Sequence, residues 1–160
     1  MIDAIDKAAG LSPDEALFNA RRLRPEFVQG AEQCRVSVLQ PANDQQLAKD
    51  LRLALACRMA RLNHDEALIA DYQAQLVELH PTESLIALAA GETTLHQPLA
   101  AIARQVDLVT LTPAKAEADD MKKLAQAGLT NPQIVALSEL IAFVNFQTRV
   151  AAGLRLMRSA

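Results

Sequence analysis

Aromatic side chains are scarce in this sequence: among 160 residues there are four Phe, one Tyr and no Trp, so aromatic residues make up 3% of the chain. Apolar residues still amount to 51%, and a core would therefore consist mainly of Leu, Ala, Ile and Val. Only five Gly are present, and the abundance of Ala, Leu, Gln, Arg and Glu favours helix throughout. A chain of this length can bury a real core and predicts a single domain, residues 1–160.

The sequence also shows no basic run, and we expect neither a leader nor a membrane-spanning stretch. The net charge is -3 with both signs interspersed, so a nucleic-acid partner is not expected. Residues 1–7 carry early acids and no following apolar run, which is not the pattern of a signal peptide. No apolar stretch approaches the ~18 residues of a membrane span. We therefore expect a cytoplasmic protein that binds neither nucleic acid nor membrane.

Cysteines and metal-ligand patterns are equally sparse. Cys34 and Cys57 are the two cysteines and form no Cys-x-x-Cys, so we expect no disulfide and two buried thiols. Cys34 shares a helical stripe with Phe27, Ala31 and Val38, which predicts that it faces the core. No His, Cys, Asp and Glu set has metal-ligand spacing, and no Gly-rich phosphate loop exists. The sequence predicts neither a metal nor a cofactor.

The clearest pattern is a pair of helices over residues 43–79 that meet at the turn Leu62-Asn63-His64-Asp65. The first arm, residues 44–62, is apolar on more than one face and predicts a helix buried in the middle of the fold. The second arm has one apolar stripe, formed by Leu68, Tyr72, Leu76 and Leu79. Asn63 is the expected N-cap of this arm, and Asp65 places negative charge on its first turn.

Proline, glycine and capping residues predict the other helices. They begin or end near Ser12, Pro25, Pro41, Thr82, Gly91, Pro98, Val106, Lys115, Gly128 and Thr130. Residues 107–113 alternate β-branched side chains, but a lone strand has no partner, so we expect a loop. Thr130 and Gln133 form a capping box that starts a helix to about Met157. Apolar residues cover more than one face of this helix, so it is either central to the monomer or shared between subunits. Because one monomer of this length would not cover every face, we expect a homo-oligomer with the long C-terminal helix in its interface.

Two segments resemble a known family. The first is the helix Arg52-Leu53-Ala54-Leu55-Ala56-Cys57-Arg58-Met59-Ala60-Arg61-Leu62-Asn63. The second, residues 111–154, contains an Ala-Gly-Leu-Thr turn and then Leu140-Ile141-Ala142-Phe143 with Asn145 two residues on. In this order they resemble the carboxymuconolactone decarboxylase superfamily, which includes alkyl hydroperoxidase D (AhpD) and peroxidase-related proteins. The resemblance implies an all-α, AhpD-like helical bundle with a central helix pair, and an assembly from dimer up to hexamer.

AhpD-like peroxidases carry Glu-x11-Cys-x2-Cys-x3-His, in which two thiols alternate between thiolate and disulfide while Glu and His move protons. Aligned through Arg61-Leu62-Asn63, the Glu position is Leu53 here. The two Cys positions are Asp65 and Leu68, and the His position is Tyr72. All four motif residues are absent, so this alignment excludes a dithiol peroxidase mechanism.

Three side chains and one thiol remain as candidate catalytic residues. His64, Asp65 and Tyr72 would line the remains of the family pocket and do acid–base work on a small carbonyl compound or lactone. Cys57 lies one turn from Leu53 on the same helix face, so it is a candidate for one-thiol redox chemistry. Each residue also has a simpler structural interpretation. His64 would be a polar turn residue and Asp65 a charge on the first turn of a helix. Tyr72 would pack in the core, and Cys57 would be an inert buried thiol.

Three functions stay open at this point. The chain is an AhpD-like, peroxidase-related protein with a degenerate motif, a cofactor-free lyase, isomerase or hydrolase of the decarboxylase kind, or a non-catalytic oligomeric subunit that binds a partner or small molecule. A pocket lined by His64, Asp65 and Tyr72 would favour an enzyme. A pocket filled by Leu53, Leu68 and Tyr72 would favour the non-catalytic subunit, and an exposed Cys57 would favour redox chemistry.

Overall fold

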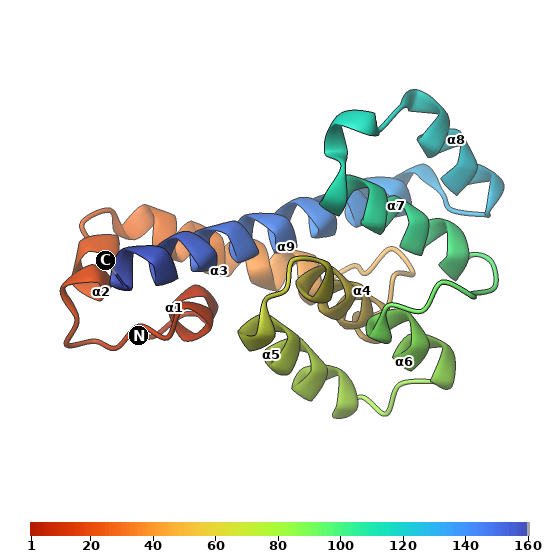
Figure 1. Ribbon diagram of the computed structural model, residues 1–160. Helices are drawn as coiled ribbons and strands as arrows, with labels where there is room; N and C mark the ends of the chain where they lie inside the picture. Colours follow the sequence, from red (N-terminus) through yellow and green to blue (C-terminus); the bar gives the residue numbers. More distant parts are fainter. Residues whose placement is uncertain (160) are drawn as a thin grey trace.

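The structure is a computed structural model that describes residues 1–159, and this part of the chain contains helices and no strand (Figure 1). The predicted all-α class and the long C-terminal helix are confirmed. The helices, in order, are α1 (Ala4–Ala9), α2 (Ala16–Arg21), α3 (Pro25–Leu39), α4 (Lys49–Leu62), α5 (Glu66–Val77), α6 (Glu83–Ala90), α7 (Leu99–Leu111), the 3-10 helix η1 (Pro113–Lys115), α8 (Ala118–Gln126) and α9 (Asn131–Arg158).

Helix α4 lies at the centre, in contact with α3, α5, α6, α7 and α9. Its apolar side chains are almost completely enclosed; Leu53, Leu55 and Met59 each retain 0% exposure. This is the arrangement that a helix with apolar residues on several faces requires. The predicted central pair is present, since α4 and α5 are joined by a short turn at residues 63–65 and lie side by side (Figure 1).

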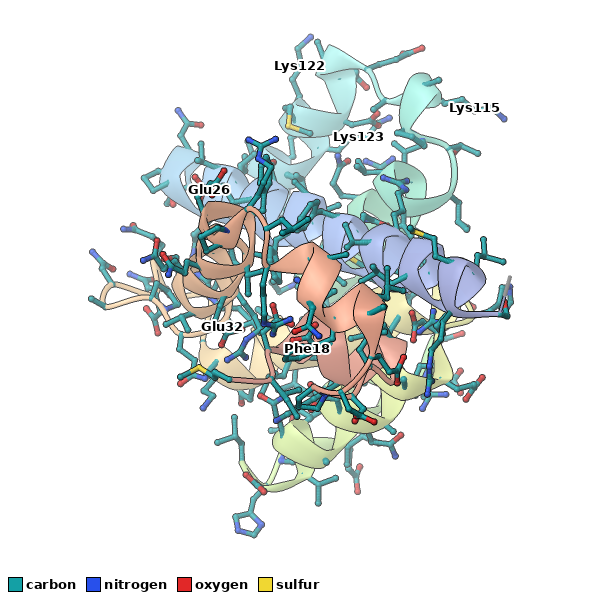
Figure 2. All side chains as sticks on the ribbon, turned by 90° about the vertical axis from the view of Figure 1, so that its left-hand side faces the viewer. Phe18, Glu26, Glu32, Lys115, Lys122 and Lys123 are labelled. Atoms are coloured by element: carbon teal, nitrogen blue, oxygen red, sulfur yellow. The ribbon has the colours of Figure 1, made fainter. Side chains whose placement is uncertain are left out.

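Helix α9 runs along the whole molecule and joins two apolar clusters (Figure 1). The Thr130–Gln133 capping box is formed as predicted, with a proline in the first turn. The middle of the helix packs on the main core, whereas Leu154 packs in a smaller cluster with the N-terminal segment: Ile5, Ala9, Leu11, Phe18 and Ala31. Figure 2 shows Phe18 among these N-terminal helices.

The long helix α9 also corrects one sequence-based statement. By length and composition alone it is able to cross a membrane, although we expected no stretch of this kind. More than half of the qualifying window, 56%, is buried inside the fold. The core helix of a globular protein passes the same test, so this finding is weak evidence for a membrane.

The loop predicted for residues 107–113 is wrong, because α7 continues to Leu111. Asp107 accepts two hydrogen bonds of 2.6 Å from the guanidinium of Arg58 on α4. One turn later, Thr110 is buried and its hydroxyl accepts a hydrogen bond from Asn145 on α9. The β-branched residues of this stretch locally favour extended backbone, but these tertiary contacts keep the stretch helical.

Three smaller predictions also need correction. Cys34 is exposed, not core-facing, because α3 buries Ala31 and Val38 but leaves the Cys34 side of the helix open. The N-cap of α5 is Asp65, whose side chain accepts the Leu68 N–H, whereas Asn63 ends α4. Helix α2 begins at Ala16, because Ser12 bonds within its own turn and does not cap the helix.

The ion pair between Arg58 and Asp107 generates a stability prediction. The Arg58 side chain is 3% exposed, so Asp107→Ala leaves a buried cation without its carboxylate. Because Asp107 itself is 30% exposed, we expect a loss of about 2–3 kcal/mol in the free energy of unfolding by urea.

Glu32→Ala is the matched control. Glu32 has a similar exposure, 35%, but its partner Arg35 is 20% exposed and can be solvated. The loss should stay below about 1 kcal/mol. Equal losses for the two variants would show that Arg58 does not depend on Asp107.

Candidate functional site

Asp65 lies at the turn between α4 and α5, is 2% exposed, and has a carboxylate that is bound by other groups of the protein. Its carboxylate accepts the Leu68 N–H at 3.2 Å and binds Arg155 of α9 at 2.7 Å. The same guanidinium donates to the Ala8 carbonyl at 2.8 Å. Asp65 therefore holds the start of α5, the end of α9 and α1 together.

His64 lies in the same turn but points to solvent. Its backbone has a φ of 55°, in the left-handed region, and its side chain is exposed. Non-glycine residues adopt this region mainly in turns. His64 is thus a residue of the turn that reverses the chain direction between α4 and α5. Within the described residues its side chain forms no hydrogen bond with Asp65 or Tyr72.

Tyr72 is enclosed in the core. Its side chain is 0% exposed, and its hydroxyl donates to Gln147 Oε1 of α9 at 2.5 Å. Burial raises the pKa of the Tyr72 phenol well above its ordinary value, and the nearby carboxylate of Asp71 acts in the same direction. The phenol is therefore held neutral and away from water.

The other two positions that the sequence analysis aligned with the AhpD-like motif are also filled by buried side chains. Leu53 and Leu68 are 0% and 1% exposed and belong to the same apolar cluster as Tyr72. The structure brings Leu53, Leu68 and Tyr72 together as packing, whereas His64 lies outside at the surface. Within the described residues, no three His, Cys, Asp or Glu side chains come close enough to hold a metal ion.

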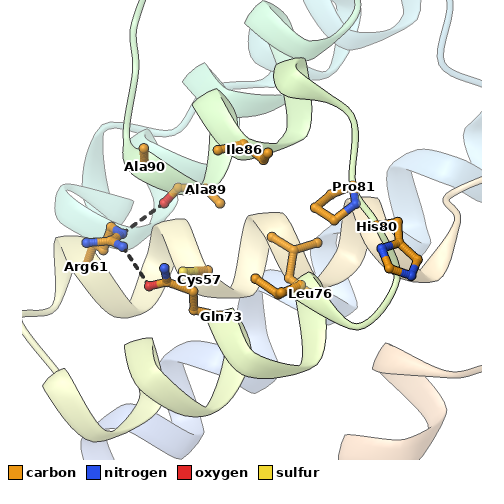
Figure 3. Close-up of a pocket in the computed structure, with 10 residues that line it drawn as sticks. Cys57, Arg61, Gln73, Leu76, His80, Pro81, Ile86, Ala89 and Ala90 are labelled. Carbon is orange, nitrogen blue, oxygen red and sulfur yellow. Dashed lines mark hydrogen bonds between the residues drawn. The ribbon is translucent and has the colours of Figure 1, made fainter.

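Cys57 faces a different place, a cavity of about 340 Å³ between α4, α5 and α6 (Figure 3). Cys57 is 1% exposed. Burial raises the pKa of the Cys57 thiol, and the positive charge of the nearby Arg61 offsets only part of this effect. The thiol therefore stays protonated at neutral pH and is a poor nucleophile.

Sequence reasoning missed the partners of these residues. Gln147 and Arg155 fix Tyr72 and Asp65 from α9, and Arg61 borders the cavity at Cys57. Asn145, noted only as part of the family resemblance, donates to Thr110 and accepts from Asn63. One signal was available, namely arginines placed inside the otherwise apolar stretch 52–61, which indicates guanidinium groups that need polar partners.

The buried phenol gives a pH prediction, which is simple to test because Tyr72 is the only tyrosine. The folded-state pKa is raised above its ordinary value of 10.0. The contribution of Tyr72 to the free energy of unfolding is therefore fully present below pH 10. It is lost as the pH rises further, because the unfolded chain releases a proton that the folded chain keeps. Tyrosinate absorbance should rise near pH 10 in urea and not in the folded protein. A midpoint near 10 in the folded protein would contradict the enclosure of Tyr72.

The comparisons with known proteins support the fold alone. The sequence matches no protein-family model and no curated protein. The structure is similar to the crystal structure of an uncharacterized peroxidase-related protein from Silicibacter sp. TM1040, with a TM-score of 0.71 and 16% identity. The match covers 95% of this chain and 79% of that one. The chain thus has the helical fold of a protein named as peroxidase-related.

Proposed function

We propose that this chain is a peroxidase-related, AhpD-like protein that lacks dithiol peroxidase activity and serves as a non-catalytic, homo-oligomeric subunit. The observation that carries the proposal is the enclosure of Leu53, Leu68 and Tyr72, at 0%, 1% and 0% exposure, where the family motif has Glu, Cys and His. Side chains that fill a site in this way leave no room for a hydroperoxide. The fold likeness to a peroxidase-related protein supports the family half of the proposal.

Neither thiol supplies a replacement for the lost pair. A peroxidatic cysteine must be a thiolate that a hydroperoxide can reach. Burial holds Cys57 in its protonated form. Cys34 is exposed on α3, far along the chain from the turn between α4 and α5, and the two cysteines form no disulfide.

Acid–base chemistry by His64, Asp65 and Tyr72 receives little support from the geometry. A lyase or hydrolase of the decarboxylase kind needs its acid and base around one substrate position. Asp65 is engaged with Arg155, Tyr72 with Gln147, and His64 is directed to solvent. The three groups thus have three separate surroundings, as structural residues do.

Support for an oligomer comes from a groove between α3 and α9. It has a volume of about 690 Å³, and Glu26 at its rim can be located in Figure 2. Phe27 and Phe146 line it and remain 59% and 46% exposed. A second copy is the occupant that we propose, because a two-fold axis would place the Phe side chains of each copy in the groove of the other. Part of α9 would then be covered, as its apolar faces require.

The redox half of the proposal is tested with an organic hydroperoxide and a dithiol reductant. Wild type, Cys57→Ser and Cys34→Ser should all show only the rate of the reagents without protein, because the chain lacks a reachable thiolate pair. A two-thiol peroxidase in the same assay is the positive control. Turnover in wild type that disappears in Cys57→Ser would falsify the proposal and assign one-thiol chemistry to the cavity.

The oligomer is tested by sedimentation velocity at micromolar concentration. Wild type should sediment as a dimer or larger, and Phe146→Asp should shift it toward monomer because a charge would be buried in the interface. Leu111→Asp is the control, since Leu111 is similarly exposed, at 57%, and does not line the groove. A wild-type monomer, or equal behaviour of the two variants, would contradict the proposed interface.

A further inference from the structure

The cavity between α4, α5 and α6 is apolar along its floor and open at its rim. Cys57, Leu76 and Ala89 form the floor and are 1%, 3% and 6% exposed. Val77 and Ile86 border the opening and are 61% and 54% exposed. The cavity of about 340 Å³ has room for roughly eleven non-hydrogen atoms at ~30 Å³ each. This is the lower end of the range for ligand pockets.

Arg61 supplies the main charge of this cavity. Its Nε donates to the Ala89 carbonyl at 3.0 Å and its Nη2 to Gln73 Oε1 at 3.2 Å, which orients the guanidinium at one end of the cavity (Figure 3). The lining residues include no Asp or Glu. Within residues 1–159 Arg61 forms no ion pair, whereas Arg58 and Arg155 each bind a carboxylate.

The two neutral acceptors leave the charge of Arg61 uncompensated. Carbonyl and amide oxygens satisfy some of the N–H groups but contribute no negative charge. A guanidinium attracts a carboxylate most strongly where water is partly excluded, because charge-assisted hydrogen bonds are stronger there. The remaining N–H groups of the fork are the donors that such a ligand would use.

We infer that this cavity binds a small apolar carboxylate, with the carboxylate at Arg61 and the hydrocarbon chain against Leu76 and Ile86. A straight-chain acid of about eight carbons matches the volume and the apolar lining. The inference does not rest on the proposed function, because the cavity lies apart from the residues of the family motif and from the groove between α3 and α9.

The first test compares octanoate with 1-octanol, which has the same chain and no charge, by isothermal titration calorimetry. Wild type should bind octanoate about tenfold or more tightly than 1-octanol, since a hydrogen bond to a charged group is worth that factor. Arg61→Gln should remove this preference and leave 1-octanol binding unchanged. The comparison on wild type decides the question even if Arg61→Gln does not fold.

The second test locates the ligand with the two natural thiols. Cys57 lines the cavity, whereas Cys34 lines the groove between α3 and α9. Because Cys57 is 1% exposed, its labelling by a small maleimide is slow and is followed over a long incubation. Octanoate should slow this reaction further in Cys34→Ser, and it should not slow the labelling of Cys34 in Cys57→Ser. Ala90→Trp, at an exposed lining position, should narrow the cavity and weaken octanoate binding.

Several results would overturn the inference. Equal affinity of wild type for octanoate and 1-octanol, or no binding of octanoate, would show that the charge of Arg61 does not select a carboxylate. Loss of octanoate binding in His80→Gln but not in Arg61→Gln would place the anchor at the other end of the cavity (Figure 3). Protection of Cys34 would place the ligand in the groove. None of these results alters the peroxidase or sedimentation outcomes, so the two proposals fail separately.

Discussion

The rest of the structure depends on the burial of most of α4 together with the polar partners of its three arginines, of which Arg52 and Arg58 are buried and Arg61 is half-buried. A helix surrounded by other helices can bury guanidinium groups only if each finds polar partners. Arg52 donates to three backbone carbonyls and so fixes the connection between α3 and α4. Arg58 binds α7 through Asp107, and Arg61 reaches α6 and α5. The neighbours of α4 are thus positioned by directional bonds, and the apolar packing fills the space between them.

The sequence predicts those parts of the fold that local chemistry determines. The capping box at Thr130 and the turn at residues 62–65 specify their helix ends through bonds within a few residues. Pro25 specifies the start of α3 through its fixed backbone angle. The helical state of residues 107–111 and the exposure of Cys34 depend on contacts with distant segments. No window of sequence contains those contacts, so local reasoning gave the wrong answer at both places.

The candidate site shows the same division. The resemblance to the AhpD-like family shows which positions would carry that family's motif, because that information lies in the residues themselves. The resemblance does not show which contacts hold the side chains at these positions. The partners of Tyr72 and Asp65 are 75 and 90 residues away in the chain. The cavity beside Arg61 could not be predicted from the sequence either, because it forms where α4, α5 and α6 leave space between them.

Helix α9 has a consequence for the cooperativity of folding. It is the element shared by the main core and the N-terminal cluster, and its last turns obtain their apolar contacts from residues 5–31. The N-terminal cluster has only six buried apolar residues, far fewer than the main core. Small clusters of this kind open at lower free energy than the global transition. We therefore expect the N-terminal cluster to open before the main core, with α9 running continuously through both.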